Sequence, residues 1–165
     1  MRVTAGGAEC NRCVASPGGC AYRSGMDAPL TIERLIDLDL PADELWALIA
    51  TGEGWQRWMV DRAGLPVAPG SSGTVVDDGV ERAVLVHEVI DRRSVTFHWG
   101  EVGRIDDLSR VTLEIVETSE GRRALKVTEQ WLAPSACADC PLRAADRWDL
   151  RACVLCLTSA TRCRV

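Results

Sequence analysis

Hydrophobic and polar residues alternate from Leu30 to Leu38, which predicts a half-buried strand. Pro41 follows, a residue suited to the first position of a helix. The next apolar residues recur at helical spacing and predict a helix with one apolar face: Leu45, Trp46, Leu48 and Ile49. Glycines at positions 52 and 54 end this helix, and Trp55 to Met59 predicts a second, short one.

The middle of the chain carries four segments with a period of two, joined by short polar turns: Val80–Ile90, Ser94–Glu101, Ser109–Thr118 and Arg122–Leu132. The sequence Asp77-Asp78-Gly79 in front of them is a hairpin turn signal. Residues 64–73 are rich in glycine, proline and serine and are predicted to be a loop. Strands joined in this way form an antiparallel meander with one face on a core and one face toward water.

A long helix is predicted from Ala144 to about Arg162, after a loop from Ala133 to Pro141. Apolar residues cover most of its circumference, so much of its length is expected to be buried. It is the one large apolar body that can cover the apolar face of the sheet. The pattern therefore predicts an α+β fold, with a curved antiparallel sheet around a C-terminal helix, two short helices after the first strand, and a gap between sheet and helix.

This order of elements resembles the START-like or SRPBCC superfamily, also called the helix-grip or Bet v-like fold. Within it, the chain is most similar to the branch of the activator of heat-shock-protein-90 ATPase homologue. The similar pieces are Pro41–Trp46, Trp55–Trp58, Glu88–Trp99, Ser109–Leu113 and Trp148–Leu150. The family usually has a Pro-Pro turn where this chain has Asp91-Arg92. The resemblance implies one domain over residues 26–165, and a scaffold that in most relatives binds apolar small molecules and in some is a polyketide cyclase or aromatase.

Composition narrows the function classes. The chain has 165 residues, 47% hydrophobic and 26% charged, which suits a single globular domain. A net charge of −5 argues against nucleic-acid binding. No apolar run approaches the ~20 residues of a membrane span, and no secretory signal is apparent, so we expect a cytoplasmic protein. Residues 1–25 lack hydrophobic periodicity and are expected to be disordered or to precede the true start at Met26. Lys126 is the only lysine among many arginines, a bias that is typical of GC-rich bacterial genomes.

Four of the eight cysteines have a spacing that can close a tetrahedral zinc site: Cys137, Cys140, Cys153 and Cys156. In the alternative interpretation, which we favour, Cys153, Cys156 and Cys163 form one helical stripe and pack as small apolar residues. No cofactor is then expected. A disulfide between Cys137 and Cys140 is not expected in a reducing cytosol.

Two titratable residues have the parity of core positions in the predicted strands. His87 shares parity with Leu85 and Val89, and Glu129 with Val127. A histidine and a glutamate in an apolar cavity are candidates for general acid/base catalysis, because burial shifts both pKa values toward neutrality. The favoured alternative is a buried polar pair, or a bulge that turns one of them outward. His98 alternates with Phe97 and is expected on the wet face.

Tryptophan and other large side chains are expected to line the cavity. The predicted ligand-binding residues are Trp58, His87, Phe97, Trp99, Leu113, Glu129, Trp131, Trp148 and Arg151. Non-catalytic binding of a hydrophobic small molecule is the favoured function. One alternative is a cyclase-like enzyme using His87 and Glu129, with Arg104 or Arg151. The other is a protein-interaction module, whose partner would meet an exposed patch.

Overall fold

The computed structural model describes residues 30–38, 40–104, 107–132 and 140–158, with side chains of the last segment described for residues 146–155. Its elements are β1 (Thr31–Asp37), α1 (Ala42–Ala50), α2 (Gly52–Trp58), β2 (Arg62–Ala63), β3 (Ser72–Asp77), β4 (Val80–Ile90), β5 (Ser94–Glu101), β6 (Ser109–Glu117), β7 (Arg123–Trp131) and α3 (Cys140–Thr158). The order matches the sequence prediction, with β2 as an addition. The predicted leader, residues 1–25, lies outside the described residues.

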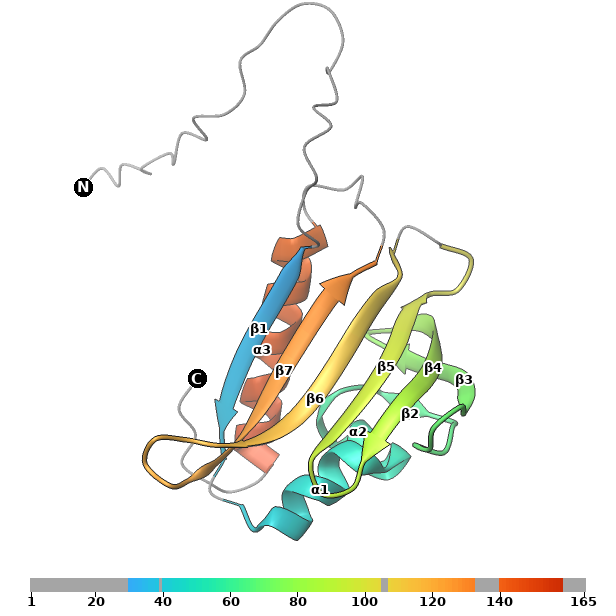
Figure 1. Ribbon diagram of the computed structural model, residues 1–165. Helices are drawn as coiled ribbons and strands as arrows, with labels where there is room; N and C mark the ends of the chain where they lie inside the picture. The colour runs from blue at the N-terminus through green and yellow to red at the C-terminus, as the bar shows by residue number, and fades with distance from the viewer. Residues whose placement is uncertain (1–29, 39, 105–106, 133–139, 159–165) are drawn as a thin grey trace, which may run out of the picture.

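The strands form one antiparallel sheet in the order β1-β7-β6-β5-β4-β3-β2. Figure 1 shows α3 lying along one face of this sheet behind β1 and β7, while α1 and α2 cover the same side at the lower end. This is the helix-grip arrangement, so the predicted α+β fold class is confirmed. Within the described residues, no helix combines the length and apolar composition that crossing a bilayer requires.

The alternation along each strand divides its residues between the two faces of the sheet. Val95, Phe97 and Trp99 of β5 point toward the helices and are at most 1% exposed. Their neighbours Thr96 and His98 are partly exposed on the outer face. One face therefore supplies the core, as expected for an antiparallel sheet covered on one side only.

Aromatic rings occupy the space between the sheet and α3. Trp58 lies 6.1 Å from Trp148, which stacks on Trp99 at 5.9 Å between centroids. Phe97 continues the series, 5.8 Å from Trp99 and 4.7 Å from Trp55. All five rings are at most 1% exposed. The gap predicted between sheet and helix is filled by this cluster at the level of β5.

The helices α1 and α2 meet at a close approach that only glycine permits. Thr51 caps α2, its Oγ1 accepting a hydrogen bond from the backbone N of Gly54 at 2.9 Å. A Cβ at Gly54 would lie 2.1 Å from the carbonyl oxygen of Ala47. The tight turn between the two helices places Trp55 and Trp58 under the sheet.

Helix α3 differs from its prediction in two ways. It begins at Cys140 rather than Ala144, and Pro141 suits its first turn. It is also buried on one side only. Trp148, Ala152 and Leu155 face the sheet at positions i, i+4 and i+7, whereas Leu150 is 65% exposed and Cys153 is exposed. The expected burial along the length of the helix is present in its described part, but only on the side that faces the sheet.

Candidate functional site

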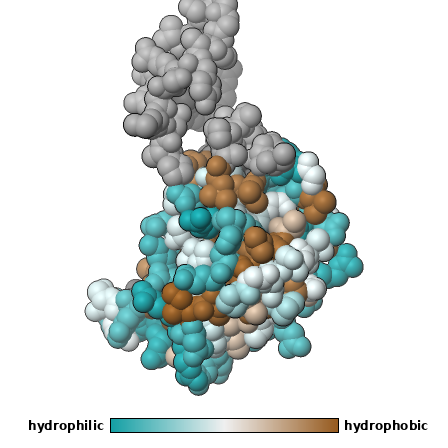
Figure 2. All heavy atoms as spheres, turned by 45° about the vertical axis from the view of Figure 1, so that its right-hand side comes forward, coloured by the Kyte–Doolittle hydropathy of each residue, from teal (hydrophilic) through white to brown (hydrophobic). Residues whose placement is uncertain are grey.

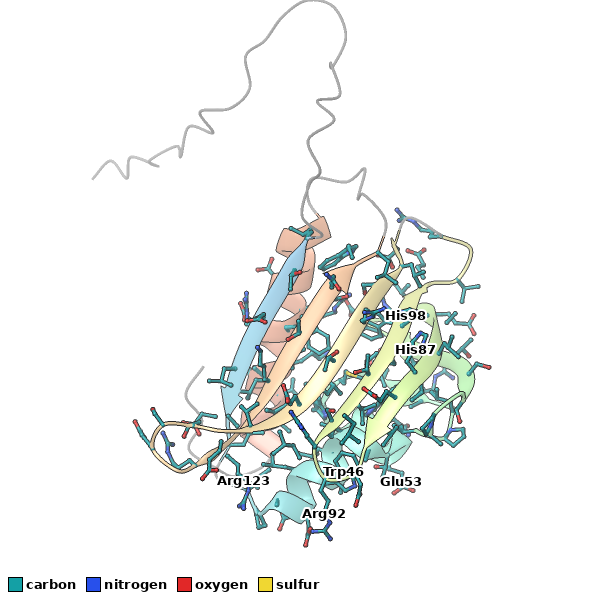
Figure 3. All side chains as sticks on the ribbon, in the orientation of Figure 1. Trp46, Glu53, His87, Arg92, His98 and Arg123 are labelled. Atoms are coloured by element: carbon teal, nitrogen blue, oxygen red, sulfur yellow. The ribbon has the colours of Figure 1, made fainter. Side chains whose placement is uncertain are left out.

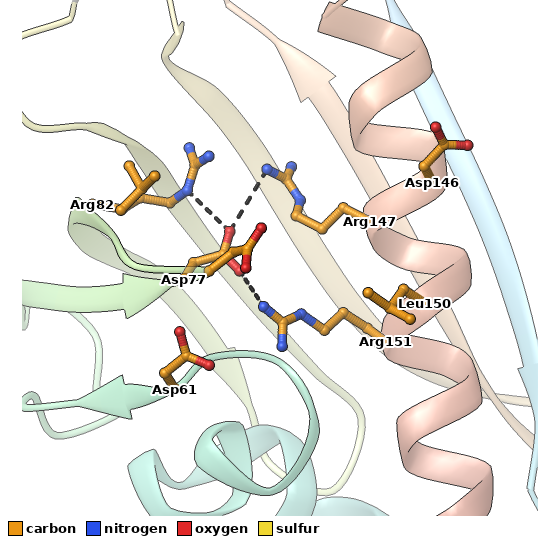
Figure 4. Close-up of a pocket in the computed structure, with 9 residues that line it drawn as sticks. Asp61, Asp77, Arg82, Asp146, Arg147, Leu150 and Arg151 are labelled. Carbon is orange, nitrogen blue, oxygen red and sulfur yellow. Dashed lines mark hydrogen bonds and ion pairs between the residues drawn. The ribbon is translucent and has the colours of Figure 1, made fainter.

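A pocket of about 500 Å³ lies between the β3–β4 hairpin and α3. Figure 4 shows the side chains that line it. They are Asp61, Asp77, Asp78, Val80, Arg82, Asp146, Arg147, Leu150 and Arg151. The pocket therefore combines apolar walls with groups of both charges, supplied from the loop after α2, the hairpin and one side of α3.

Asp77 is the hub of this pocket. It ends β3, where the turn at Asp78 and Gly79 takes the positive φ angles typical of an Asp-Gly hairpin. Its carboxylate is 2% exposed and faces three guanidinium groups. The Nε of Arg82 donates to Oδ2 at 3.1 Å and Nη2 of Arg151 donates to Oδ1, while Nη1 of Arg147 lies 3.8 Å from Oδ2. The hairpin and α3 are thus joined by charge.

Glu129 of β7 lies behind Arg147 and is 1% exposed. Its two oxygens accept hydrogen bonds from four side chains. The donors are Trp99 Nε1 (3.0 Å), Ser109 Oγ (2.7 Å), Trp148 Nε1 (2.7 Å) and Arg147 Nη2 (2.7 and 2.9 Å). A buried carboxylate is tolerated when its lone pairs are satisfied in this way.

The floor of the pocket is electrically balanced. Arg82 also pairs with Asp107, with 2.7 Å between Nη1 and Oδ2. Three guanidinium groups therefore face three carboxylates, those of Asp77, Asp107 and Glu129. Arg147 in addition lies over the Trp99 ring, 4.8 Å from its centroid. Its buried Nε has no hydrogen-bond partner among the described residues.

The rim of the pocket has a different character. Asp61, Asp78 and Asp146 are exposed there and have no cationic partner among the described residues. Leu150, two thirds exposed, and the partly exposed Val80 provide apolar wall. A ligand would thus pass acidic and apolar groups before it meets the guanidinium donors.

Most of the predicted ligand-binding residues share the inner side of the sheet. Trp99, Glu129, Trp148 and Arg151 are at or directly behind the pocket floor. The others of this group are buried in the core: Trp58, Phe97, Leu113 and Trp131. The structure places these residues, and their role in ligand binding stays a prediction.

His87 does not lie where its parity predicted. His87 shares its face with Leu85, which is 40% exposed and pairs with His98 on the outer face. The β-bulge between Val86 and Glu88 returns Val89 to the inner face, so the parity of Leu85 and Val89 did not indicate one common face. The Nε2 of His87 lies 2.8 Å from Nδ1 of His98, and Figure 3 shows the two side chains next to each other on β4 and β5. His87 is exposed, so its placement in the cavity is corrected.

The acid/base group predicted from the sequence is therefore not assembled. His87 and Glu129 lie on opposite faces of the sheet. Arg104 is about half exposed, beside Glu101 at 3.6 Å. Burial, His87 and Arg110 lower the pKa of His98 on the outer face.

The zinc prediction falls largely outside the described part of the chain. Cys137 is not described, nor are the side chains of Cys140 and Cys156, so neither zinc nor a Cys137–Cys140 disulfide is tested. Cys153 is exposed, with a free thiol. Among the described residues, no group of three or more histidine, cysteine or acidic side chains is arranged to hold a metal ion.

Sequence reasoning missed Asp77, Arg82 and Arg147. Asp77 was interpreted only as part of a turn. One signal was available in α3: Arg147 and Arg151 are four residues apart and so share one face of a helix. Their carboxylate partners come from distant strands, which no local pattern reveals.

Comparison with known proteins supports the resemblance to the superfamily through the fold. The chain is similar to DynU16, a protein of the dynemicin biosynthetic locus (TM-score 0.64, 18% identity, 79% of this chain and 48% of that one). It is similar to PFC0360w, an HSP90 activator from Plasmodium falciparum (TM-score 0.66, 14% identity, 81% and 99% covered). It also resembles Aha1 from Colwellia psychrerythraea (TM-score 0.61, 15% identity, 76% and 92% covered).

The comparisons show a similar fold without close similarity in sequence. This chain spans about half the length of DynU16. No family model matches the sequence, and no curated protein matches it. At 14–18% identity the likeness concerns the helix-grip fold, which hosts proteins of different function.

Proposed function

We propose, from the helix-grip fold that this chain shares with the SRPBCC superfamily, that the protein binds a mainly hydrophobic small molecule without chemical change. The binding site is the pocket between the β3–β4 hairpin and α3. The observation that carries the proposal is this pocket itself, of about 500 Å³, within the 300–1,000 Å³ range typical of ligand sites. Val80 and Leu150 supply the apolar wall, and the other seven lining residues are charged, which is more than is usual for a small-molecule site.

The charges favour an uncharged ligand with an oxygen acceptor at one end. The acidic rim disfavours an anion, and the guanidinium groups at the floor disfavour a cation. Arg151 lines the pocket with its side chain 15% exposed, and it has five N–H donors, one of which is bonded to Asp77. A carbonyl or phenol oxygen could accept a hydrogen bond there, while the apolar body of the ligand contacts Leu150 and Val80.

The enzyme alternative has less support. Its two candidate residues, His87 and Glu129, are separated by the sheet. Glu129 is occupied by hydrogen bonds to tryptophan, serine and arginine donors. General acid/base catalysis needs a group that can reach the substrate, directly or through one water molecule.

The protein-partner alternative rests on the HSP90 activators among the structural neighbours. Exposed large apolar residues occur on β1 and β4, among them Leu35, Leu85 and Ile90. On the face turned forward in Figure 2, apolar residues form separate patches between polar ones. A broad apolar surface would support a protein interface more strongly.

Fluorescence titration with prodan tests the proposal, because this probe is an uncharged naphthalene with one ketone oxygen. We expect saturable binding to the full chain, weakened about tenfold or more by Arg151→Ala, since a hydrogen bond to a charged group contributes about 1.5–3 kcal/mol. Leu150→Glu, at an exposed wall position, should also weaken binding.

The matched control is Arg93→Ala, which removes an exposed arginine from the outer face of the sheet. It should leave prodan binding unchanged. Thermal unfolding of each variant verifies that the fold is retained. Absence of saturable binding, or equal affinity for the wild type and the folded Leu150→Glu and Arg151→Ala variants, would reject this pocket as the site.

A further inference from the structure

The two histidines of the outer sheet face form a second cluster, unconnected with the pocket. His87 of β4 lies beside His98 of β5, with 3.9 Å between the ring centroids. The nitrogens Nε2 of His87 and Nδ1 of His98 are 2.8 Å apart. His98 pairs with Leu85, and His87 is two residues further along β4 on the same face.

We propose that His87 and His98 together bind a divalent transition-metal ion, with Cu²⁺ the best fit. Imidazole nitrogen binds such metals at about 2.0–2.1 Å. Two bonds of that length at a right angle separate the nitrogens by about 2.9 Å, and at a tetrahedral angle by about 3.4 Å. The observed 2.8 Å is near the right-angle value, and right angles are typical of tetragonal Cu²⁺ and Ni²⁺ sites. Cu²⁺ binds nitrogen ligands more tightly than Ni²⁺ does.

The protonation state of the two histidines is compatible with metal binding. Arg110 Nε donates to His98 Nε2 at 3.3 Å, so Nδ1 carries the ring proton and donates it to Nε2 of His87. The lowered pKa of His98 favours the neutral ring that a metal requires. When a metal binds at Nδ1, the ring proton moves to Nε2 and the contact with Arg110 is lost. The Arg110 side chain is exposed and free to turn away.

Both rings are accessible from solvent, so water can complete the coordination. His87 is exposed and His98 partly so. No third histidine, cysteine or acidic side chain of the described residues joins them in a metal-binding group. The cation Arg110 weakens the site by repulsion, and its removal should strengthen metal binding.

Cu²⁺ titration followed by electron paramagnetic resonance tests the proposal. The full chain is used with its thiols blocked by iodoacetamide, because eight cysteines would compete for the metal. We expect one bound Cu²⁺ per chain with the hyperfine pattern of two imidazole nitrogens. His87→Gln and His98→Gln should each weaken it by at least about tenfold, since even the loss of a residue that only supports a ligand costs about 10–100-fold.

Arg110→Gln serves as the matched variant, because it changes the same cluster and leaves both ligands in place. It should bind Cu²⁺ more tightly than the wild type. Circular dichroism verifies that each variant is folded. A spectrum without imidazole nitrogens, or an affinity that neither histidine substitution changes, would overturn the proposal whatever the result with prodan.

Discussion

At the scale of single residues, the buried carboxylate of Glu129 holds several elements together. Its carboxylate on β7 accepts hydrogen bonds from β5, β6 and α3. Its burial would be costly without these donors, because a desolvated charge loses several kcal/mol of hydration. The position of α3 on the sheet therefore depends on one charged side chain as well as on the aromatic core.

Replacing Glu129 by alanine should lower the free energy of unfolding by about 3–5 kcal/mol, since it leaves Arg147 buried and poorly paired. Urea unfolding measures this loss. Glu33→Ala is the control, because it removes an exposed ion pair with Lys126, worth at most about 1 kcal/mol. Equal effects of the two substitutions would show that Glu129 is not an anchor.

His98 should make stability depend on pH. Its pKa in the folded state lies below the ordinary value of about 6.5, through desolvation first and then the charges of His87 and Arg110. The unfolded chain takes up the proton first, so this contribution is present above about pH 6.5 and is lost as pH falls through the lowered pKa.

The test compares unfolding of the wild type and His98→Gln from about pH 8 to about pH 5. The wild type should lose more stability toward acid than the variant, because glutamine does not titrate in this range. Parallel curves for the two proteins would contradict the lowered pKa of His98.

At the scale of elements, alternation and helical spacing predicted the strands and helices well, because those signals are local. The same signals gave wrong or incomplete predictions where contacts between distant elements determine which side chains are buried. Leu85 is apolar and yet 40% exposed on the outer face, so the parity that it shares with His87 misplaced the histidine. Leu150 is apolar yet two thirds exposed, because the sheet covers only the side of α3 that carries Trp148. Arg147 and Arg151, the partners of Asp77 in α3, are distant in sequence, so its role as a hub could not be foreseen.

The contact between α1 and α2 gives a prediction at this scale. Gly54→Ala should destabilise the protein by about 1–3 kcal/mol or more, because its Cβ would meet backbone oxygens that cannot move aside independently. Gln56→Ala, at an exposed position of the same helix, should change stability by no more than about 0.5 kcal/mol. Thermal or urea unfolding of both variants measures the difference; a tolerated alanine at position 54 would contradict the close approach.

At the scale of the whole molecule, the sheet and α3 grip an aromatic core, and charge gathers at one end of it. Trp99 and Trp148 belong to both regions, because their rings pack in the core and their Nε1 atoms donate to Glu129. The helix-grip fold is shared with solved structures at 14–18% identity, and the group of arginines and carboxylates is described from this chain alone. The proposed ligand site is at this charged end and not in a closed apolar cavity.

The most direct test of that claim is the ¹⁵N–¹H spectrum of the six tryptophan indoles, recorded while prodan is added. Single Trp→Phe variants assign the signals. The account predicts that Trp99 and Trp148 shift, because both lie against Arg147 at the pocket floor. Trp55 should stay in place, because its Nε1 donates to Ile49 in the opposite part of the core. Shifts at Trp55 with none at Trp99 and Trp148, or no shift at all, would contradict ligand binding in this pocket.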